Sequence, residues 1–116
     1  MNGAVTVKVY GIGNCDTVRA AMRELAAAGL GPELVDIRAE PAEAADLERF
    51  LQAFGEALVN RRSATWRGLS EAERGLDPVR LISAHPTVMK RPVIEAEGRL
   101  TLGWGPEARA VWLGNG

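Results

Sequence analysis

The stretch Val5-Thr-Val-Lys-Val-Tyr-Gly-Ile-Gly-Asn-Cys15 is the most informative part of the sequence for the fold. It predicts a strand and a turn, after which comes the only cysteine of the chain. Between Val5 and Tyr10, valines alternate with polar residues, which predicts a short strand with one face in the core. Gly11–Asn14 contains two glycines and an asparagine, which predicts a turn. From Cys15 to Ala28 the residues favour helix, so the cysteine is predicted to stand at a helix N-terminus.

The residues after Cys15 predict a parallel βαβ unit. The predicted helix carries apolar residues on one face, at Val18, Met22, Leu25 and Ala26. Gly29 and Gly31 are expected to end it, because glycine accepts the left-handed conformation of a helix cap. Pro32–Arg38 then reads as a strand centred on Leu34 to Ile37. A strand, a helix and a strand within so few residues predict parallel pairing with a right-handed crossover.

The middle of the chain predicts helices only. Pro41 can open a helix whose apolar stripe ends before Gly55, namely Leu47, Phe50, Leu51 and Phe54. Shorter helices are expected over three segments, 56–59, 70–74 and 77–84.

The last third predicts a β-hairpin and a final helix. Val93–Ala96 and Leu100–Leu102 flank a glycine turn, and a helix is expected to begin at Gly105-Pro-Glu107 and run through Trp112. The tail from Gly114 is expected to fray. The order β-α-β, helices, β-β-α is that of an α/β thioredoxin-like fold, with a central mixed sheet of about four strands flanked by helices and a helical insertion.

Composition limits the classes of protein that the chain can belong to. The 116 residues, 47% hydrophobic and 25% charged, predict a single domain over residues 1–116. A formal net charge of −1 argues against nucleic acid or an anionic membrane as partner, and no apolar run is long enough to span a bilayer.

Without a secretory signal pattern at its start, the chain is expected to be cytoplasmic. One cysteine and one histidine cannot form an internal disulfide or a zinc site, so no metal and no bound cofactor are expected.

Cys15 is predicted to be a reactive thiol. The first N–H groups of a helix lack partners and the helix dipole is positive there, so a thiolate or another anion is favoured. Arg19 lies one helical turn further on, where a cation could steady both a thiolate and an anionic substrate. Asp16 opposes this effect through its own negative charge. The alternative is an inert cysteine packed as a small apolar residue, with Arg19 simply solvated.

Three motifs together resemble the arsenate reductase (ArsC) family, and specifically its YffB-like branch related to the Spx regulators. They are Tyr10-Gly-Ile-Gly-Asn-Cys-Asp-Thr17, Thr65-Trp66-Arg67 and Lys90-Arg91-Pro92, and the likeness runs from about Val5 to Trp112. The resemblance implies a thioredoxin-like fold with a helical insertion. It also implies a cysteine that attacks an oxyanion substrate, glutathione as co-substrate, and glutaredoxin as a partner that returns the thiol to its reduced state.

The resemblance also implies roles for individual residues. Cys15 matches the nucleophile, Arg19 the arginine of the Cys-x3-Arg pattern, and Arg91 the arginine before a cis-proline at Pro92. Asn60 falls where the reductases place an oxyanion-binding arginine, and in the YffB-like branch this arginine matches Arg62. Residues implied to bind substrate or glutathione are Asn14, Asp16, Thr17, Arg62 and Pro92.

Departures from the family pattern shape the functional prediction. Gly11 stands in place of a histidine, and the region of Gly103-Trp104 offers no third arginine, which argues against efficient arsenate reduction. Val18 replaces the second cysteine of the Spx redox switch, so an intramolecular disulfide is excluded. The preferred prediction is a glutathione-dependent, single-cysteine thiol oxidoreductase. The alternatives are an arsenate reductase proper and a non-catalytic, Spx-like regulator that binds a large protein such as RNA polymerase.

Overall fold

The computed structural model describes residues 6–114, which divide into two compact units. The sheet unit consists of the chain up to Asp36 and from Arg91 onward, and the helical unit is Ile37–Lys90. The single domain expected over residues 1–116 stays a prediction.

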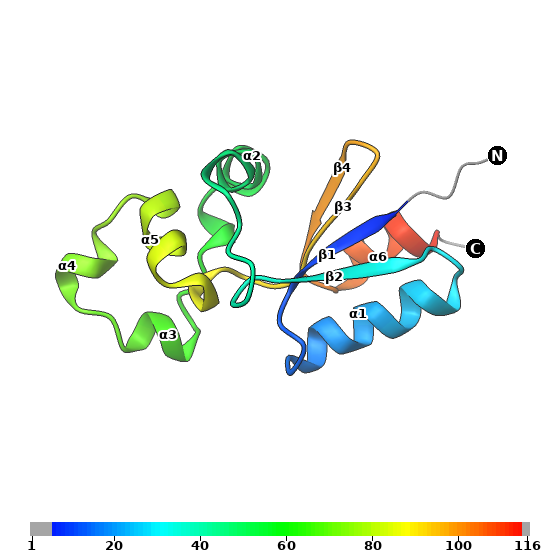
Figure 1. Cartoon of the computed structure of the whole chain (residues 1–116), viewed down its shortest axis with the longest axis horizontal. Helices are drawn as coiled ribbons and strands as arrows, with labels where there is room; N and C mark the ends of the chain where they lie inside the picture. The colour runs from blue at the N-terminus through cyan, green and yellow to red at the C-terminus, as the bar shows by residue number, and fades with distance from the viewer. Residues whose placement is uncertain (1–5, 115–116) are drawn as a thin grey trace. The chain divides into compact units, whose positions relative to one another are not determined.

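The sheet unit contains a four-stranded mixed sheet with the strand order β2-β1-β3-β4 (Figure 1). Its strands are β1 (Val7–Gly11), β2 (Pro32–Asp36), β3 (Val93–Ala96) and β4 (Arg99–Leu102). β1 pairs with β2 in parallel and with β3 in antiparallel register, and β3 and β4 form the hairpin. The α/β architecture predicted from the sequence is therefore confirmed.

Both ends of the β1–β2 pair differ from the sequence prediction. β1 extends to Gly11, which had been expected in the turn, while Val5 lies outside the described residues. β2 ends at Asp36, the partner of Gly11, because β1 offers no further residue to pair with. A turn at residues 37–39 therefore takes Ile37 and Arg38 out of the strand.

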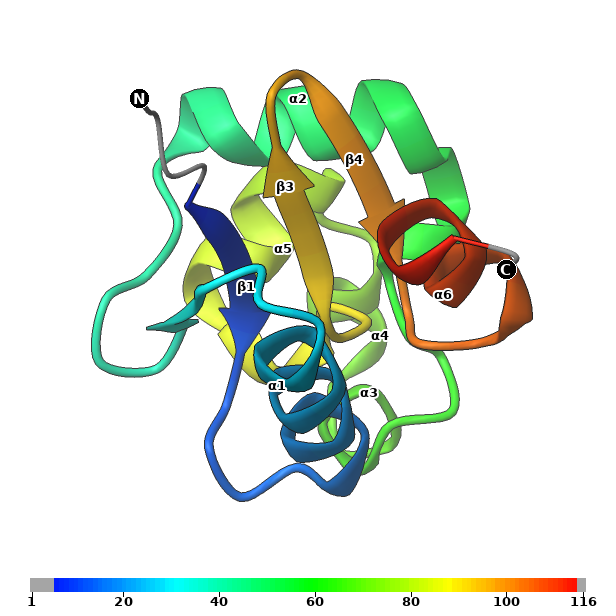
Figure 2. The ribbon, with the colours of Figure 1, turned by 90° about the vertical axis from the view of Figure 1, so that its right-hand side faces the viewer.

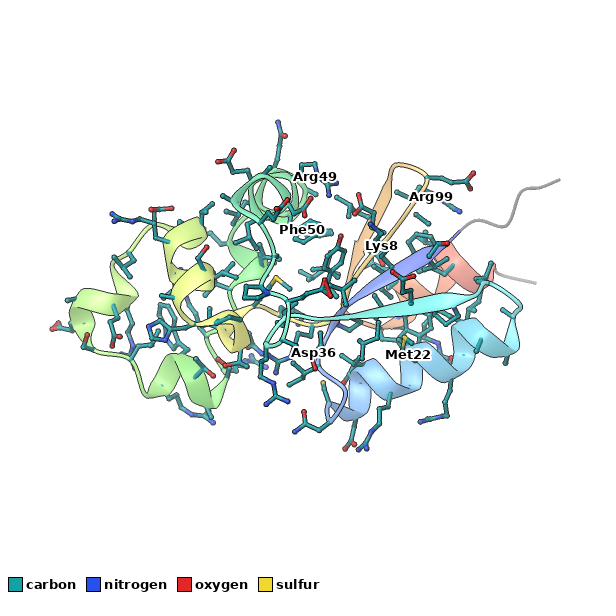
Figure 3. The ribbon with its side chains drawn as sticks, in the orientation of Figure 1. Lys8, Met22, Asp36, Arg49, Phe50 and Arg99 are labelled. Atoms are coloured by element: carbon teal, nitrogen blue, oxygen red, sulfur yellow. The ribbon has the colours of Figure 1, made fainter. Side chains whose placement is uncertain are left out.

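Two helices, α1 (Asp16–Ala27) and α6 (Pro106–Leu113), lie on the same face of the sheet (Figure 2). The core between them contains valines from β1, Ile94 and Ala96 from β3, and the buried faces of the two helices. Met22 packs against this core from α1 (Figure 3). Ala26 is exposed and Ala21 is buried, which corrects the predicted helix face, because Val18, Ala21 and Leu25 follow the 3.6-residue period more closely.

Trp112 joins α6 to β4. Its indole N–H donates to the hydroxyl of Thr101 over 2.7 Å, and both residues are buried. The guanidinium of Arg99 lies 5.0 Å from the centre of the Trp112 ring and covers its outer side. The polar atom of a large apolar side chain is thus satisfied inside the core, which fixes how the last helix sits on the sheet.

The helical unit is a series of short helices after one longer helix. The elements are α2 (Ala44–Phe54), η1 (Gly55–Leu58), α3 (Ala64–Arg67), α4 (Glu71–Arg74), α5 (Pro78–Ala84) and η2 (Pro86–Val88). Leu47 and Phe50 are fully buried, as the apolar stripe of α2 predicted. Pro41 does not open α2, which begins after Glu43 instead, and neither α3 nor η2 was predicted. No helix within residues 6–114 has the length and apolar character needed to cross a membrane.

Side-chain caps explain why helices of only one turn form here. Ser63 caps α3 by accepting the N–H of Trp66, and Asp77 caps α5 in the same way. Ser70 and Glu73 form a complete capping box around α4. Such caps satisfy backbone donors that a short helix otherwise leaves without partners.

Glu73 makes the capping box sensitive to pH. Its carboxylate accepts the backbone N–H of Ser70 over 2.9 Å and lies 3.1 Å from Nε2 of His85. The hydrogen bonds from Ser70, and then the charge of His85, hold the pKa of Glu73 below its ordinary value. A depressed pKa in the folded state adds stability that is present above the unfolded pKa, about 4.3, and is lost as the pH falls through the lower folded value.

We therefore expect the Glu73→Gln variant, which keeps an acceptor for the cap, to be less stable than the wild type near neutral pH. The difference in free energy of unfolding should shrink as the pH falls below about 4.3. Urea unfolding at a series of pH values measures it. A difference that stays constant from neutral to strongly acidic pH would contradict the role given to the Glu73 charge.

Candidate active site at the start of α1

Cys15 is the N-cap residue of α1, as the sequence predicted. Its backbone is extended (φ −94°, ψ 124°), and its carbonyl oxygen accepts the N–H of Arg19 over 2.9 Å. Its own N–H donates to the carbonyl of Ile12 over 3.2 Å, which closes the turn between β1 and α1. The side chain is half-buried, and no side chain caps the helix. The first-turn N–H groups therefore remain available to an anion beside the sulfur.

The residues next to Cys15 are exposed. Asn14, Asp16 and Thr17 are all open to solvent, while Val18 is fully buried. Three of the side chains predicted to contact a substrate are therefore exposed next to Cys15 in the sequence, and Val18, the position matched to a second cysteine, belongs to the core. A thiol at residue 18 would point into packed side chains and away from solvent.

Arg19 forms an ion pair with Asp16. One guanidinium nitrogen lies 2.7 Å from the Asp16 carboxylate, and both side chains are largely exposed. This pair offsets the charge of Asp16, which the sequence alone set against a thiolate at Cys15. An exposed pair of this kind is worth only about 0–1 kcal/mol, so an anionic ligand could draw the guanidinium away.

The cis peptide bond between Arg91 and Pro92 directly precedes β3. It lies at the end of the β1–β3 pair from which the chain turns toward Cys15. Tyr10 pairs with Val93, so Pro92 stands beside the end of β1, from which the chain leaves toward Cys15. The N–H of Gly103, the residue after β4, donates to the carbonyl of Pro92 over 2.8 Å and joins β4 to the segment before β3. Pro92 is buried and Arg91 half-buried. The cis bond confirms what the family resemblance implied.

Trp104 carries a polar group at this end of the sheet to which the sequence assigned no role. It follows Gly103 directly, and its side chain is 9% exposed. Its indole N–H is buried and has no hydrogen-bond partner among residues 6–114. Buried donors are normally satisfied, so this N–H is a donor still open to a ligand or to water. The sequence could not have revealed this unpaired N–H, because it becomes evident only when the hydrogen-bond partners around Trp104 are known in the folded structure.

Arg62, the other arginine matched to the family, belongs to the helical unit. Its backbone N–H donates to Oδ1 of Asn60 over 3.0 Å, and its side chain is exposed. Asn60 therefore uses its amide oxygen to form a turn, where the reductases carry an arginine. Within the sheet unit, Cys15, its exposed neighbours and Arg19 lie at the start of α1, and the Arg91–Pro92 segment precedes β3 beside the end of β1.

A four-stranded mixed sheet in this order, with a helix that follows the first strand and begins after the lone cysteine, is typical of a thioredoxin-like protein. Comparison with known proteins identifies the family within this class of fold. The sequence model of the ArsC family matches residues 10–110. The chain belongs to the ArsC family.

Individual relatives agree with this assignment. An uncharacterized protein of Haemophilus influenzae is 38% identical over 103 residues, covering 84% of this chain and 90% of its own. The solved structure of a protein called YFFB is 33% identical, with a TM-score of 0.84, and covers 92% of this chain and 98% of its own. An arsenate reductase (ArsC) related protein from Brucella melitensis is 35% identical, with a TM-score of 0.72, 97% of this chain covered and 98% of its own. The YffB-like membership predicted from the three motifs is confirmed.

Proposed function

We propose that the chain is a glutathione-dependent thiol oxidoreductase with Cys15 as its nucleophile. The observation that carries the proposal is the position of Cys15, half-buried at the uncapped N-terminus of a twelve-residue helix. The free N–H groups of the first turn and the positive end of the helix dipole favour an anionic ligand or leaving group at this position. Membership of the ArsC family supports a thiol-based reaction.

The proposed reaction consists of two thiol–disulfide exchanges. The Cys15 thiolate attacks the glutathione sulfur of a mixed disulfide, which forms a Cys15–glutathione disulfide and releases the other thiol, which takes up a proton. A second glutathione, as its thiolate, attacks the glutathione sulfur of this intermediate. Oxidised glutathione leaves, and the Cys15 thiolate is restored. Two electrons pass from glutathione to the substrate, and no second cysteine is required.

Cations near the thiol would hold the carboxylates of glutathione. Arg19 lies one helical turn from Cys15. Arg91 precedes Pro92, which stands beside the end of β1. The open N–H groups of the first turn of α1 are suited to a carboxylate or to the leaving thiolate. We also assign Arg62, an exposed side chain of the helical unit, to anion binding, because it matches an oxyanion-binding arginine of the family.

A steady-state assay tests this function. The full chain is mixed with glutathione and a small mixed disulfide of glutathione, and formation of oxidised glutathione is coupled to glutathione reductase. We expect turnover that saturates in the mixed disulfide and depends on added glutathione. A rate equal to that of the two reagents without protein would contradict the proposal.

Arsenate reduction has weaker support. One similar solved structure is that of an arsenate reductase (ArsC) related protein, but here Gly103 and Trp104 occupy the region where a third arginine was expected. Fewer cations stabilise a multiply charged oxyanion less well. We therefore expect arsenate, supplied with glutathione and glutaredoxin, to be turned over more slowly than the mixed disulfide. Binding of RNA polymerase by an Spx-like regulator stays an alternative that a pull-down with the Cys15→Ser protein would test.

A further inference from the structure

The turn between η1 and α3 is built around Asn60. Oδ1 of its side chain accepts the backbone N–H of Arg62 over 3.0 Å, and its carbonyl oxygen accepts the N–H of Ser63 over 3.1 Å. The first hydrogen bond closes an Asx turn and the second a β-turn, in which Arg61 and Arg62 are the two central residues. The backbone of Arg62 is therefore held by one side chain, that of Asn60, as well as by the main chain.

Both ends of this turn are anchored in the helical unit. Before it, the N–H of Asn60 donates to the carbonyl of Val88 over 2.8 Å, and the N–H of Lys90 donates to the carbonyl of Leu58 over 2.7 Å. Leu58 and Val88 are fully buried. After it, the hydroxyl of Ser63 donates to the carbonyl of Asn60 over 2.7 Å, and the same oxygen caps α3. Since the ends are fixed, the internal shape of the turn decides where Arg62 lies.

The two arginines of the turn differ in how the helical unit engages them. Arg61 lies 3.3 Å from the Glu56 carboxylate, and its guanidinium stands 5.5 Å from the centre of the Trp66 ring. The side chain of Arg62 is exposed and takes part in no ion pair or hydrogen bond among residues 6–114. No contact of its own guanidinium fixes Arg62, so its placement follows from its backbone.

An arginine at residue 60, as in the reductases, could not close this turn. The Asx turn requires an acceptor on the side chain of residue 60, whereas a guanidinium carries only N–H donors. Asparagine and aspartate supply that acceptor, and serine and threonine do so more weakly. The asparagine at residue 60 therefore lacks the cation of the reductases and in its place provides the group that orders Arg62.

We propose that Asn60 is a positioning residue, which sets the affinity for glutathione by holding Arg62 in place. The inference rests on the proposed function, in which Arg62 binds an anionic group. Asn60 acts only through Arg62 and takes no part in the exchange at the sulfur atoms. Without the Asx turn the Arg62 guanidinium would sample many positions, and ordering it on binding would weaken the affinity.

Steady-state kinetics of the full chain with glutathione and a mixed disulfide test this role. Arg62→Ala is expected to raise the KM for glutathione about tenfold, as for loss of one charge-assisted contact. Asn60→Ala should raise it about threefold or more, with kcat nearly unchanged. In an Arg62→Ala background, Asn60→Ala should change KM no further, because the residue through which it acts is absent.

Asn60→Arg separates positioning from charge. This variant adds a cation to the loop and removes the acceptor of the Asx turn. If residue 60 acted through its charge, the KM for glutathione would fall, whereas loss of the turn should raise it. A lower KM in Asn60→Arg, an unchanged KM in Asn60→Ala, or an effect of Asn60→Ala that persists in the Arg62→Ala background would each overturn the proposal.

Hydrogen exchange of the Arg62 amide, followed by NMR without substrate, tests the turn independently of activity. This amide should exchange about tenfold faster in Asn60→Ala than in the wild type, and Asn60→Asp, which keeps the acceptor, should retain the slow rate. Ser70→Ala is the matched control, because it removes a side-chain cap from α4 in the same unit. It should change neither the KM nor the exchange of Arg62. Unaltered exchange in Asn60→Ala would overturn the positioning role, whereas a wild type with the expected exchange and no turnover would contradict the proposed function.

Discussion

Cys15→Ser is expected to reduce glutathione-dependent turnover by at least about 10³-fold, to the background rate. The hydroxyl of serine is far less acidic than a thiol and forms no disulfide, so neither exchange step can occur. The chain contains no second cysteine that could take over. The coupled assay with a mixed disulfide and glutathione measures this loss directly.

The same substitution carries its own control for folding. Cys15 occupies the N-cap of α1 and provides no side-chain cap, whereas serine is among the preferred N-cap residues. The variant should therefore be at least as stable as the wild type toward urea, and its loss of turnover cannot come from unfolding. Full turnover in a Cys15→Ser protein would rule out the thiol as nucleophile.

Gly11→Ala is expected to destabilise the protein by about 1–3 kcal/mol, a typical cost of forcing extra volume into a packed core. A Cβ atom at Gly11 would stand 2.6 Å from one methyl carbon of Val18 and 3.1 Å from the other. Val18 is fully buried in the core between β1 and α1, so it has little room to move. Urea unfolding of the two proteins measures the loss.

Two further variants test the reason for this loss. In a Val18→Ala background, where the crowding methyl groups are absent, the additional cost of Gly11→Ala should largely disappear. Gly13→Ala is the matched control, because a Cβ atom there meets only a Leu34 methyl at 3.9 Å. If Gly11→Ala lowers the free energy of unfolding as much in the Val18→Ala background as in the wild type, the close approach of Gly11 and Val18 is not the cause of the lost stability.

The crowding also gives a structural reason for the absence of a side chain just before the turn that leads to Cys15. Gly11 is the last residue of β1, and the helix that begins after Cys15 crosses directly over it. The sequence showed only a glycine where related reductases carry a histidine. The larger residue would require a smaller partner at position 18.

Much of the fold could be predicted because its signals are local. Alternating valines marked β1, the apolar stripe of α2 marked its buried face, and glycine marked the ends of helices. The failures have physical reasons as well. α3 and η2 are too short to show a hydrophobic period, and α3 depends on the cap from Ser63. Pro41 suits a first helical turn but lies before the residue that begins α2.

The candidate site could be predicted only in part. Cys15 was found because a strand, a turn and a helix follow one another along the chain. Asn60 looked like an incomplete match to an arginine, because its role depends on hydrogen bonds within the turn. The unpaired indole N–H of Trp104 and the position of Lys90 across from Leu58 depend on contacts between distant segments. No local pattern encodes such contacts.

The central claim is that Cys15 is a nucleophile activated by its place in the fold and completed by an external thiol. The most direct test treats the protein with oxidised glutathione near neutral pH and follows the glutathionyl adduct by peptide mass spectrometry, in the native state and in denaturant. We predict one glutathionyl group on Cys15, formed faster in the native protein than in the unfolded chain and removed again by excess glutathione. A native protein that forms no adduct at Cys15, or forms it no faster than the unfolded chain, would contradict the account.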